Sequence, residues 1–179
     1  RPLMSKDIIL KIAGDYSAEV AQYKSVEFTG PAADAMSVDS RMTVSNMAVE
    51  IGAKFGFFVF DKKARAYLGE KGRGLAAVDA DEGALYEKIY ELDIGNLEPQ
   101  VALPHTVDNV KPVSQVGEVL IDQAVLGSCT NGRLEDLEDV LHHQVVDEVA
   151  VCLPFSHWDL VDAIASIAMD DGKIVRVPM

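Results

Sequence analysis

The chain has 179 residues, of which 49% are hydrophobic and 25% are charged. This length and composition are typical of a globular protein with one domain or two small ones. The net charge of −13 argues against a general nucleic-acid binder, because binding to phosphates needs clustered lysine and arginine. No apolar stretch reaches the roughly 18 residues that cross a bilayer, and the first residues lack the apolar core of a secretory signal. We therefore expect a cytoplasmic protein with no membrane partner.

The cysteine content restricts the chemistry further. Only Cys129 and Cys152 are present, and neither belongs to a CxxC pair or has a histidine at ligand spacing. The chain therefore has neither a disulfide framework nor a zinc site of its own. Two unpaired thiols fit a reducing compartment.

Helical and strand patterns alternate along the first 100 residues. Ser5 is a favourable helix N-cap, and Gly14 is a typical helix stop. Alternating polar and apolar residues predict a strand over 24–29, and a short aromatic run predicts a buried strand over 56–61. The remaining predicted elements are a helix from Asp39 or Ser40 to about Lys54, an irregular stretch over 62–82, and a helix marked by Leu85, Ile89 and Leu92.

The second half of the chain shows a more regular alternation. Pro99, Pro104 and Pro112 break regular structure over residues 96–116, which predicts a linker. Beyond it we expect strands over 119–126, 149–153 and 174–177, joined by helices that begin near Leu134 and Ser156, the second ending at Gly172. Such an order implies right-handed crossovers and a small parallel Rossmann-like βαβαβ unit.

The predicted organisation is therefore α/β. A domain over residues 1–100 is followed by a proline-containing linker over 101–116 and by the parallel unit over 117–179.

The densest candidate for a functional site is the sequence GSCTNGR at residues 127–133, between a predicted strand and a predicted helix. A turn at the carboxyl edge of a parallel sheet is where ligands bind in open α/β folds. Cys129, near a helix N-terminus, would be a competent metal ligand or nucleophile there. The alternative is a buried turn cysteine. A phosphate-binding P-loop fits poorly, because Arg133 and Leu134 replace its final lysine and hydroxyl residue.

Two polar residues of the second predicted helix form another candidate pair. Asn46 and Glu50 lie four residues apart, so they share a face of an α-helix and could point together into a cleft. The alternative is an ordinary solvated helix face. His105 lies in a turn-rich segment, PHTVDNV at 104–110, and is interpreted as a loop histidine.

These motifs resemble those of one enzyme family. The residues IDQ at 121–123, followed by GSCTNGR at 127–133, resemble the cluster-cysteine motif of the aconitase superfamily. The segments VEFTG at 26–30 and RMTVSNMAVEIGAK at 41–54 are similar to the signature of that family's second domain. PHTVDNV at 104–110 is similar to the archaeal-type large subunits of 3-isopropylmalate and homoaconitate dehydratases. The resemblance covers about residues 1–135 and implies an aconitase-like second domain.

The resemblance also implies a chemistry. Cys129 would be one of three thiolates that hold a [4Fe–4S] cluster whose fourth iron is open to substrate. Asn46 would lie close to the cluster, and Glu50 would help to position the substrate hydroxyl or water. Such an iron acts as a Lewis acid in dehydration and rehydration of a hydroxy acid. A dehydratase small subunit would be the partner.

The chain departs from the family pattern in ways that bear on activity. The two later cluster cysteines and the family's histidine-bearing segments are absent, and Ser45 stands where many relatives carry cysteine. One thiolate at Cys129 does not hold a cluster that needs three, and Cys152 has a strand context unlike that of the missing ligands. We expect the cluster to be absent from this chain alone, and with it the activity.

The last part of the chain has a different resemblance. Residues 132–179 are similar to the Rossmann-like domain of bacterial polyprenyl-phosphate sugar transferases, which predicts a natural or constructed chimera. Three hypotheses follow. The chain is a dehydratase-derived fragment, with Cys129, Asn46 and Glu50 as remnants of its site. It is instead a non-catalytic recombined or engineered α/β module, or a nucleotide- or anion-binding module that uses the turn at 127–133.

Overall fold

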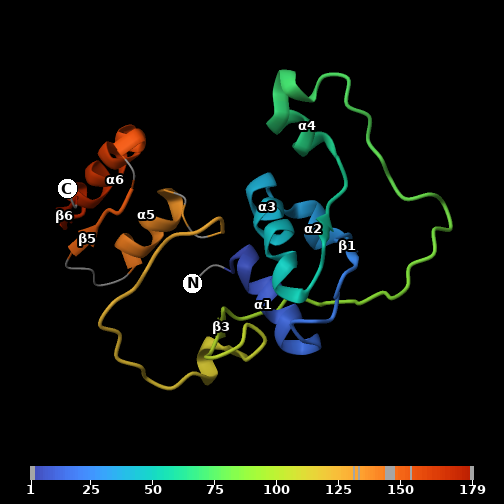
Figure 1. The fold of residues 1–179 in the computed structure, drawn as a ribbon, viewed down its shortest axis with the longest axis horizontal. Coiled ribbons are helices and arrows are strands. Elements are labelled where there is room, and N and C mark those ends of the chain that lie inside the picture. Colours follow the sequence, from blue (N-terminus) through green and yellow to red (C-terminus); the bar gives the residue numbers. More distant parts are fainter. Residues whose placement is uncertain (1–2, 131, 133, 144–147, 154, 178–179) are drawn as a thin grey trace. The chain divides into compact units, whose positions relative to one another are not determined.

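A computed structural model describes residues 3–130, 132, 134–143, 148–153 and 155–177 (Figure 1). The chain divides into two compact units, Arg1–Leu120 and Ile121–Met179, each of which combines helices with small sheets. The predicted α/β class is therefore confirmed. Over the described residues, no helix is both long enough and apolar enough to span a membrane.

The first unit contains a parallel strand pair, a hairpin and short helices. The parallel pair is β1 (Ser25–Glu27) with β2 (Phe55–Phe57), and the antiparallel hairpin is β3 (Gln100–Ala102) with β4 (Val110–Pro112). The α-helices are α1 (Ser5–Tyr16), α2 (Pro31–Ala35), α3 (Val38–Met47) and α4 (Lys62–Leu68). The 3-10 helices are η1 (Ala48–Ile51), η2 (Gly69–Gly72) and η3 (Val113–Gln115).

Helix α1 and the β3–β4 hairpin pack against each other. The helix passes through Gly14 and ends two residues later, so the predicted stop at Gly14 is wrong. Gly14 is instead a point of close approach, because a Cβ there would lie 2.8 Å from Cβ of Val110. The buried Asp7 carboxylate accepts a hydrogen bond of 2.8 Å from the backbone N–H of Gln100. The hairpin thus lies within the first unit.

The segment predicted as a linker is therefore structured. Residues 101–116 contain most of the hairpin as well as η3, so an irregular linker there is wrong. Pro99 directly precedes β3, Pro104 lies in the connecting turn and Pro112 ends β4. Prolines at the ends of short strands are compatible with a two-stranded ladder, which is why three of them did not prevent its formation.

Two further predictions in this unit are wrong. Residues 62–72 form α4 and η2, because Asp61 caps α4 by accepting hydrogen bonds from the N–H groups of Lys63 and Ala64, and only residues 73–82 of the predicted irregular stretch are irregular. No helix forms over 85–92, where Leu85 is 99% exposed and Ile89 is 74% exposed. Two of the three stripe residues stay largely exposed, and the segment is held by Tyr86 on Glu27 and by Glu87 on Lys24.

The core of the first unit lies between α1 and α3. Ile9 and Val44 are fully buried and pack with Leu10 and Met47, while Phe28 and Phe58 stack on this cluster with ring centroids 5.2 Å apart. A second cluster joins η1 to the end of α1, through Ala13, Ala21, Ala48, Ile51 and Ala53. The helix that carries Asn46 therefore rests on the best-packed part of the unit.

The second unit contains α5 (Leu134–His143), β5 (Glu148–Ala150), η4 (Phe155–His157), α6 (Trp158–Asp170) and β6 (Ile174–Arg176). Strands β5 and β6 are parallel, and Gly172, at φ +70°, ends the turn after α6 as predicted. The expected strand over 119–126 is not formed in the part of the chain that the structure describes, so the sheet has two strands instead of three. Both helices predicted for this part are present.

One ion pair in the first unit makes stability depend on pH. The buried guanidinium of Arg41 donates a hydrogen bond of 2.7 Å to Asp61. This bond, with the capping N–H of Ala64, holds the pKa of Asp61 well below its usual value. A depressed pKa in the folded state stabilises the fold above the unfolded pKa of about 3.9, and the gain is lost as pH falls toward the folded pKa.

We therefore expect the unfolding free energy to fall as pH drops below about 4, and Asp61→Asn to be less stable at neutral pH with a flatter acid limb. Urea unfolding at a series of pH values measures both effects. The exposed Asp79→Asn is the matched control and should keep the wild-type profile. An acid limb that Asp61→Asn leaves unchanged would rule out this ion pair as its cause.

Candidate functional site

Asn46 and Glu50 lie where α3 gives way to η1. Ser37 caps the start of α3, since its hydroxyl accepts a hydrogen bond of 3.1 Å from the N–H of Ser40. The α-helix ends at Met47, and the chain winds on as η1 to Gly52, whose φ of +82° is the left-handed conformation that ends a helix. The predicted start near Asp39 is close to the observed one, whereas a single helix to Lys54 is wrong.

This change of winding affects how the two side chains are arranged. Both Asn46 and Glu50 are exposed. A 3-10 helix turns further per residue than an α-helix, so Glu50 is rotated further round the axis than spacing in one α-helix would give. Asn46 lines a pocket that Glu50 does not line. The pair lies on adjacent turns of one surface segment rather than on one narrow stripe.

The segment that carries this pair is held firmly from behind. Ser45 donates a hydrogen bond of 3.0 Å from its hydroxyl to the carbonyl of Gly56 in β2. A Cβ on Gly56 would lie 2.9 Å from Cβ of Ala48, so only glycine lets β2 approach η1 so closely. These contacts fix the backbone on both sides of Asn46.

The loop before β1 secures the end of η1. The N–H of Ala21 donates to the carbonyl of Ile51 and the N–H of Tyr23 to that of Gly52, each at 3.0 Å. The N–H of Lys54 donates in return to the carbonyl of Lys24 at 2.8 Å. This network brings residues 21–24 beside residues 51–54, far apart in sequence, and so forms one side of the pocket.

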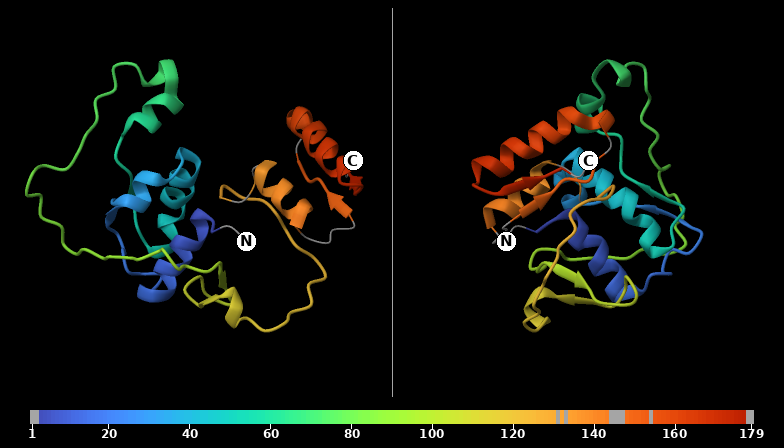
Figure 2. Two further views of the ribbon diagram at one scale, coloured as in Figure 1. Left: turned by 180° about the vertical axis from the view of Figure 1, so that it is seen from behind. Right: turned by 60° about the vertical axis from the view of Figure 1, so that its left-hand side comes forward.

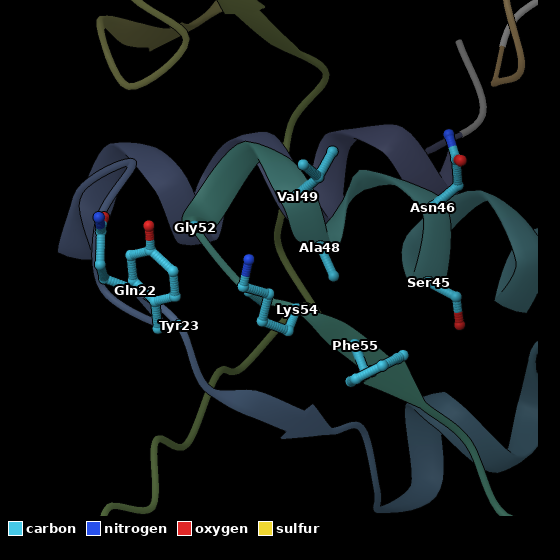
Figure 3. A pocket seen from close by; sticks show the side chains of 10 residues that line it. Gln22, Tyr23, Ser45, Asn46, Ala48, Val49, Gly52, Lys54 and Phe55 are labelled. Atoms are coloured by element: carbon cyan, nitrogen blue, oxygen red, sulfur yellow. The ribbon is translucent and has the colours of Figure 1, made fainter.

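The pocket has a volume of about 490 Å³ and lies beside Asn46 (Figure 3). Among the lining residues, Lys54 carries the positive charge, and its Nζ lies 4.5 Å from the ring centroid of Tyr23. Sequence patterns missed this pocket, because Gln22 and Tyr23 carry no motif and reach it only through pairing of β1 with β2. The lining residues are Gln22, Tyr23, Ser45, Asn46, Ala48, Val49, Gly52, Ala53, Lys54 and Phe55.

Cys129 belongs to the second unit, in a tight turn before α5. Ser128 has a φ of +100°, rare for a residue other than glycine, and its hydroxyl accepts a hydrogen bond of 3.3 Å from the N–H of Thr130. A Cβ on Gly132 would lie 2.8 Å from the carbonyl oxygen of Ser128, so the turn requires glycine there. Cys129 itself is exposed and outside any disulfide, which excludes the buried turn cysteine.

The potential metal ligands of the chain lie apart from one another. Within the described ranges, no three or more histidine, cysteine or acidic side chains gather as a metal site. Cys152 is exposed two residues after β5, and His105 is exposed in the turn between β3 and β4, as the loop interpretation predicts. Asn46 and Glu50 lie in the first unit, and Cys129 lies in the second.

Comparison with known proteins identifies the family. The profile described as "Aconitase family (aconitate hydratase)" matches residues 2–120, which is the whole first unit except its first residue. The chain belongs to the aconitase family. Asn46 and Glu50 lie inside the matched region, and Cys129 lies beyond it.

Curated relatives extend this likeness. The chain is 49% identical over 135 residues to the 3-isopropylmalate dehydratase large subunit of Elusimicrobium minutum (strain Pei191), covering 74% of this chain and 32% of that protein. It is 47% identical over 135 residues to the large subunit of the same name from Nitratidesulfovibrio vulgaris (strain DSM 19637 / Miyazaki F), covering 75% and 32%. The chain thus spans about a third of these relatives of the aconitase family.

A third comparison reaches into the second unit. The 3-isopropylmalate dehydratase large subunit of Heliobacterium modesticaldum (strain ATCC 51547 / Ice1) is 40% identical over 183 aligned residues, covering 97% of this chain and 44% of that protein. This alignment includes the part of the chain after Cys129.

Proposed function

We propose that this chain is a segment of the large subunit of an aconitase-family hydro-lyase of the 3-isopropylmalate dehydratase type. The observation that carries the proposal is the pair Asn46 and Glu50, exposed on a helix end that a hydrogen-bond network holds in place, inside the region that matches the family. Relatives named 3-isopropylmalate dehydratase large subunit support the hydro-lyase assignment. The substrate class is then a 2-isopropylmalate- or homoaconitate-type hydroxy acid.

Each candidate residue has a role in this proposal. Glu50 positions the substrate hydroxyl or water, and its exposed carboxylate is accessible for that. Asn46 lies beside the cluster, and it is one of the residues that line the pocket. Cys129 is a ligand, and its exposure in a turn that glycine and Ser128 hold tightly suits a thiolate that binds iron.

The ligand set of this chain alone does not fit a [4Fe–4S] cluster. The family resemblance implies three thiolates, and the sequence contains two cysteines. Cys152 follows a strand and is not preceded by a turn like that of Cys129. In the proposal Cys129 supplies one ligand, and the remaining ligands come from residues outside this sequence.

A segment exchange tests the proposed function. The aligned 135 residues of the Nitratidesulfovibrio vulgaris large subunit would be replaced by the corresponding part of this chain, and the product assayed with its small subunit for dehydration of 2-isopropylmalate. We expect kcat/KM within about tenfold of the parent protein, which corresponds to about 1.4 kcal/mol of transition-state stabilisation. A folded, small-subunit-bound exchange protein without activity would contradict the proposal.

The rival proposal is a non-catalytic α/β module, and the absence of a complete thiolate set in this sequence favours it for the isolated chain. Anaerobic reconstitution of the exchange protein with iron and sulfide distinguishes the two. A stable brown species lost in Cys129→Ser favours a cluster site, and a colourless exchange protein favours the module.

We further propose a partner, a location and an origin for the last residues of the chain. The name "large subunit" of the relatives implies a small-subunit partner for the parent enzyme. A cytoplasmic location suits an iron–sulfur enzyme of leucine biosynthesis. The sugar-transferase likeness of residues 132–179 would make the chain a chimera, and the intact mass with the full coding sequence tests that.

A further inference from the structure

The pocket beside Asn46 has a wall of one charge sign. Lys54 is the charged residue among those that line it, and none of the chain's 29 acidic residues lines it. Among the residues that the structure describes, no carboxylate forms an ion pair with Lys54. Although the chain has a net charge of −13, an anion that enters this pocket therefore meets an ammonium and no wall carboxylate.

The ammonium of Lys54 is held in place. The backbone N–H of Lys54 donates to the carbonyl of Lys24 at 2.8 Å, and its Nζ lies 4.5 Å from the ring centroid of Tyr23. Figure 3 shows the Lys54 side chain between those of Tyr23 and Phe55. A ring attracts an ammonium over its face, and one ring face does not use all three N–H donors of the ammonium. Lys54 can therefore bind an anion while it stays on Tyr23.

Tyr23 adopts a backbone conformation that core packing does not explain. Its φ is +59°, in the left-handed region that a bulky residue rarely enters, and its side chain is 74% exposed. The hydrogen bond from its N–H to the carbonyl of Gly52 holds it there. Residues with a strained backbone gather at ligand sites. The strain at Tyr23 therefore supports a binding role for the wall that it forms.

The other side of the pocket offers apolar surface. Val49 is 66% exposed and Phe55 is 62% exposed, although both are large hydrophobic side chains, and both line the pocket together with Lys54. Binding sites for small molecules combine apolar walls with a few polar groups that orient the ligand. The volume of about 490 Å³ is also in the range of such sites.

We propose that this pocket binds a small aliphatic carboxylic acid, with its carboxylate on Lys54 and its apolar carbons on Val49 and Phe55. A carboxylate carries one negative charge, which the one ammonium of the wall matches. Gln22 lines the same pocket and adds amide N–H donors for the second carboxylate oxygen.

The inference goes beyond the proposed function and does not depend on it. Asn46 lines the pocket, whereas Glu50 and Cys129 do not. Binding of a carboxylate here needs neither a cluster nor a small subunit, so it can be measured on the full chain by itself. A negative result would leave the proposed hydro-lyase function untouched.

Titration of the full chain with 3-methylbutanoate, followed by two-dimensional amide NMR, tests the site. We expect saturable shifts at Gln22, Tyr23, Lys54 and Phe55. The neutral isostere 3-methylbutanamide should bind at least about tenfold more weakly, because it lacks the charge. Acetate should also bind at least about tenfold more weakly, because it lacks the apolar body. Equal affinity for the neutral amide, or tighter binding of inorganic phosphate, would overturn the proposal.

Lys54→Gln should weaken the binding of 3-methylbutanoate at least about tenfold, and the exposed position of Lys54 lets the variant fold. Lys88→Gln is the matched control, because Nζ of Lys88 also lies 4.5 Å from a tyrosine ring, that of Tyr90, but Lys88 lies outside this pocket. Lys88 belongs to residues 73–99, which Figure 2 draws as a plain trace without helix or strand. The control should keep the wild-type affinity. Unchanged affinity in Lys54→Gln, or no saturable shift in the wild-type chain, would overturn the proposal.

Discussion

Glu50→Gln, made in the exchange protein that carries this segment, should lower kcat by roughly 10²-fold, the cost found when a reacting group is no longer held in position. Glu50 is exposed and lies on η1, whose backbone is fixed by residues 21–24. The substitution keeps the shape of the side chain and removes its charge. The loss should therefore appear in kcat, while the melting temperature stays unchanged.

Glu82→Gln is the matched control, because Glu82 is also exposed but lies far along the chain from η1. Steady-state kinetics with both variants separate a local role from a general effect of charge. Full activity in Glu50→Gln would show that Glu50 has no role in the site and is an ordinary solvated helix residue.

Ile9→Ala should destabilise the first unit by about 2–5 kcal/mol, because truncation of a fully buried isoleucine leaves a cavity. Ile9 is 0% exposed and packs with Leu10, Val44 and Met47 between α1 and α3. A loss of this size is a large part of the 5–15 kcal/mol typical of a whole domain. Because α3 carries Asn46, the same substitution should also loosen the candidate site.

Urea unfolding followed by circular dichroism measures this effect. Ile89→Ala makes the same chemical change at a side chain that is 74% exposed, and it should cost less than about 0.5 kcal/mol. Equal losses in the two variants would show that α1 and α3 do not form the core of this unit.

The sequence predicts those parts of the fold that local signals determine. Residues near Asp39 start a helix because hydroxyl and acidic side chains cap helices well, and the structure has a cap at Ser37. The strand pair at 25–27 and 55–57 follows from alternation and from an aromatic run. The predicted buried strand over 56–61 is wrong in length and burial, because pairing with β1 covers only Phe55–Phe57 and both phenylalanines are exposed. The second-unit helices follow from apolar stripes, which the structure retains.

The wrong secondary-structure predictions share one physical cause, which is the presence or absence of contacts with residues far away in the sequence. Gly14 has the properties of a helix stop but serves close packing against Val110, a residue 96 positions away. Leu85 and Ile89 have helical spacing but no face of the protein to cover them. Propensity and periodicity describe what a segment can form, and packing decides whether it forms.

In the candidate site, too, local sequence predicts some features and tertiary packing decides the others. Asn46, Glu50 and Cys129 could be named from their motifs, and the structure places each of them at the surface. The change from α-helix α3 to 3-10 helix η1 between Asn46 and Glu50 could not be predicted from the sequence, because it depends on Gly56 and the approach of β2. Lys54 and Tyr23 come together only through the pairing of β1 with β2.

The central proposal is that Cys129 is an iron ligand in an aconitase-family large subunit, and the iron content of the exchange protein tests it most directly. Anaerobically reconstituted protein should contain the full cluster, Cys129→Ser should lose the cluster iron and its visible absorption, and the control Glu82→Gln should retain both. Retention of the intact cluster in Cys129→Ser would contradict the account.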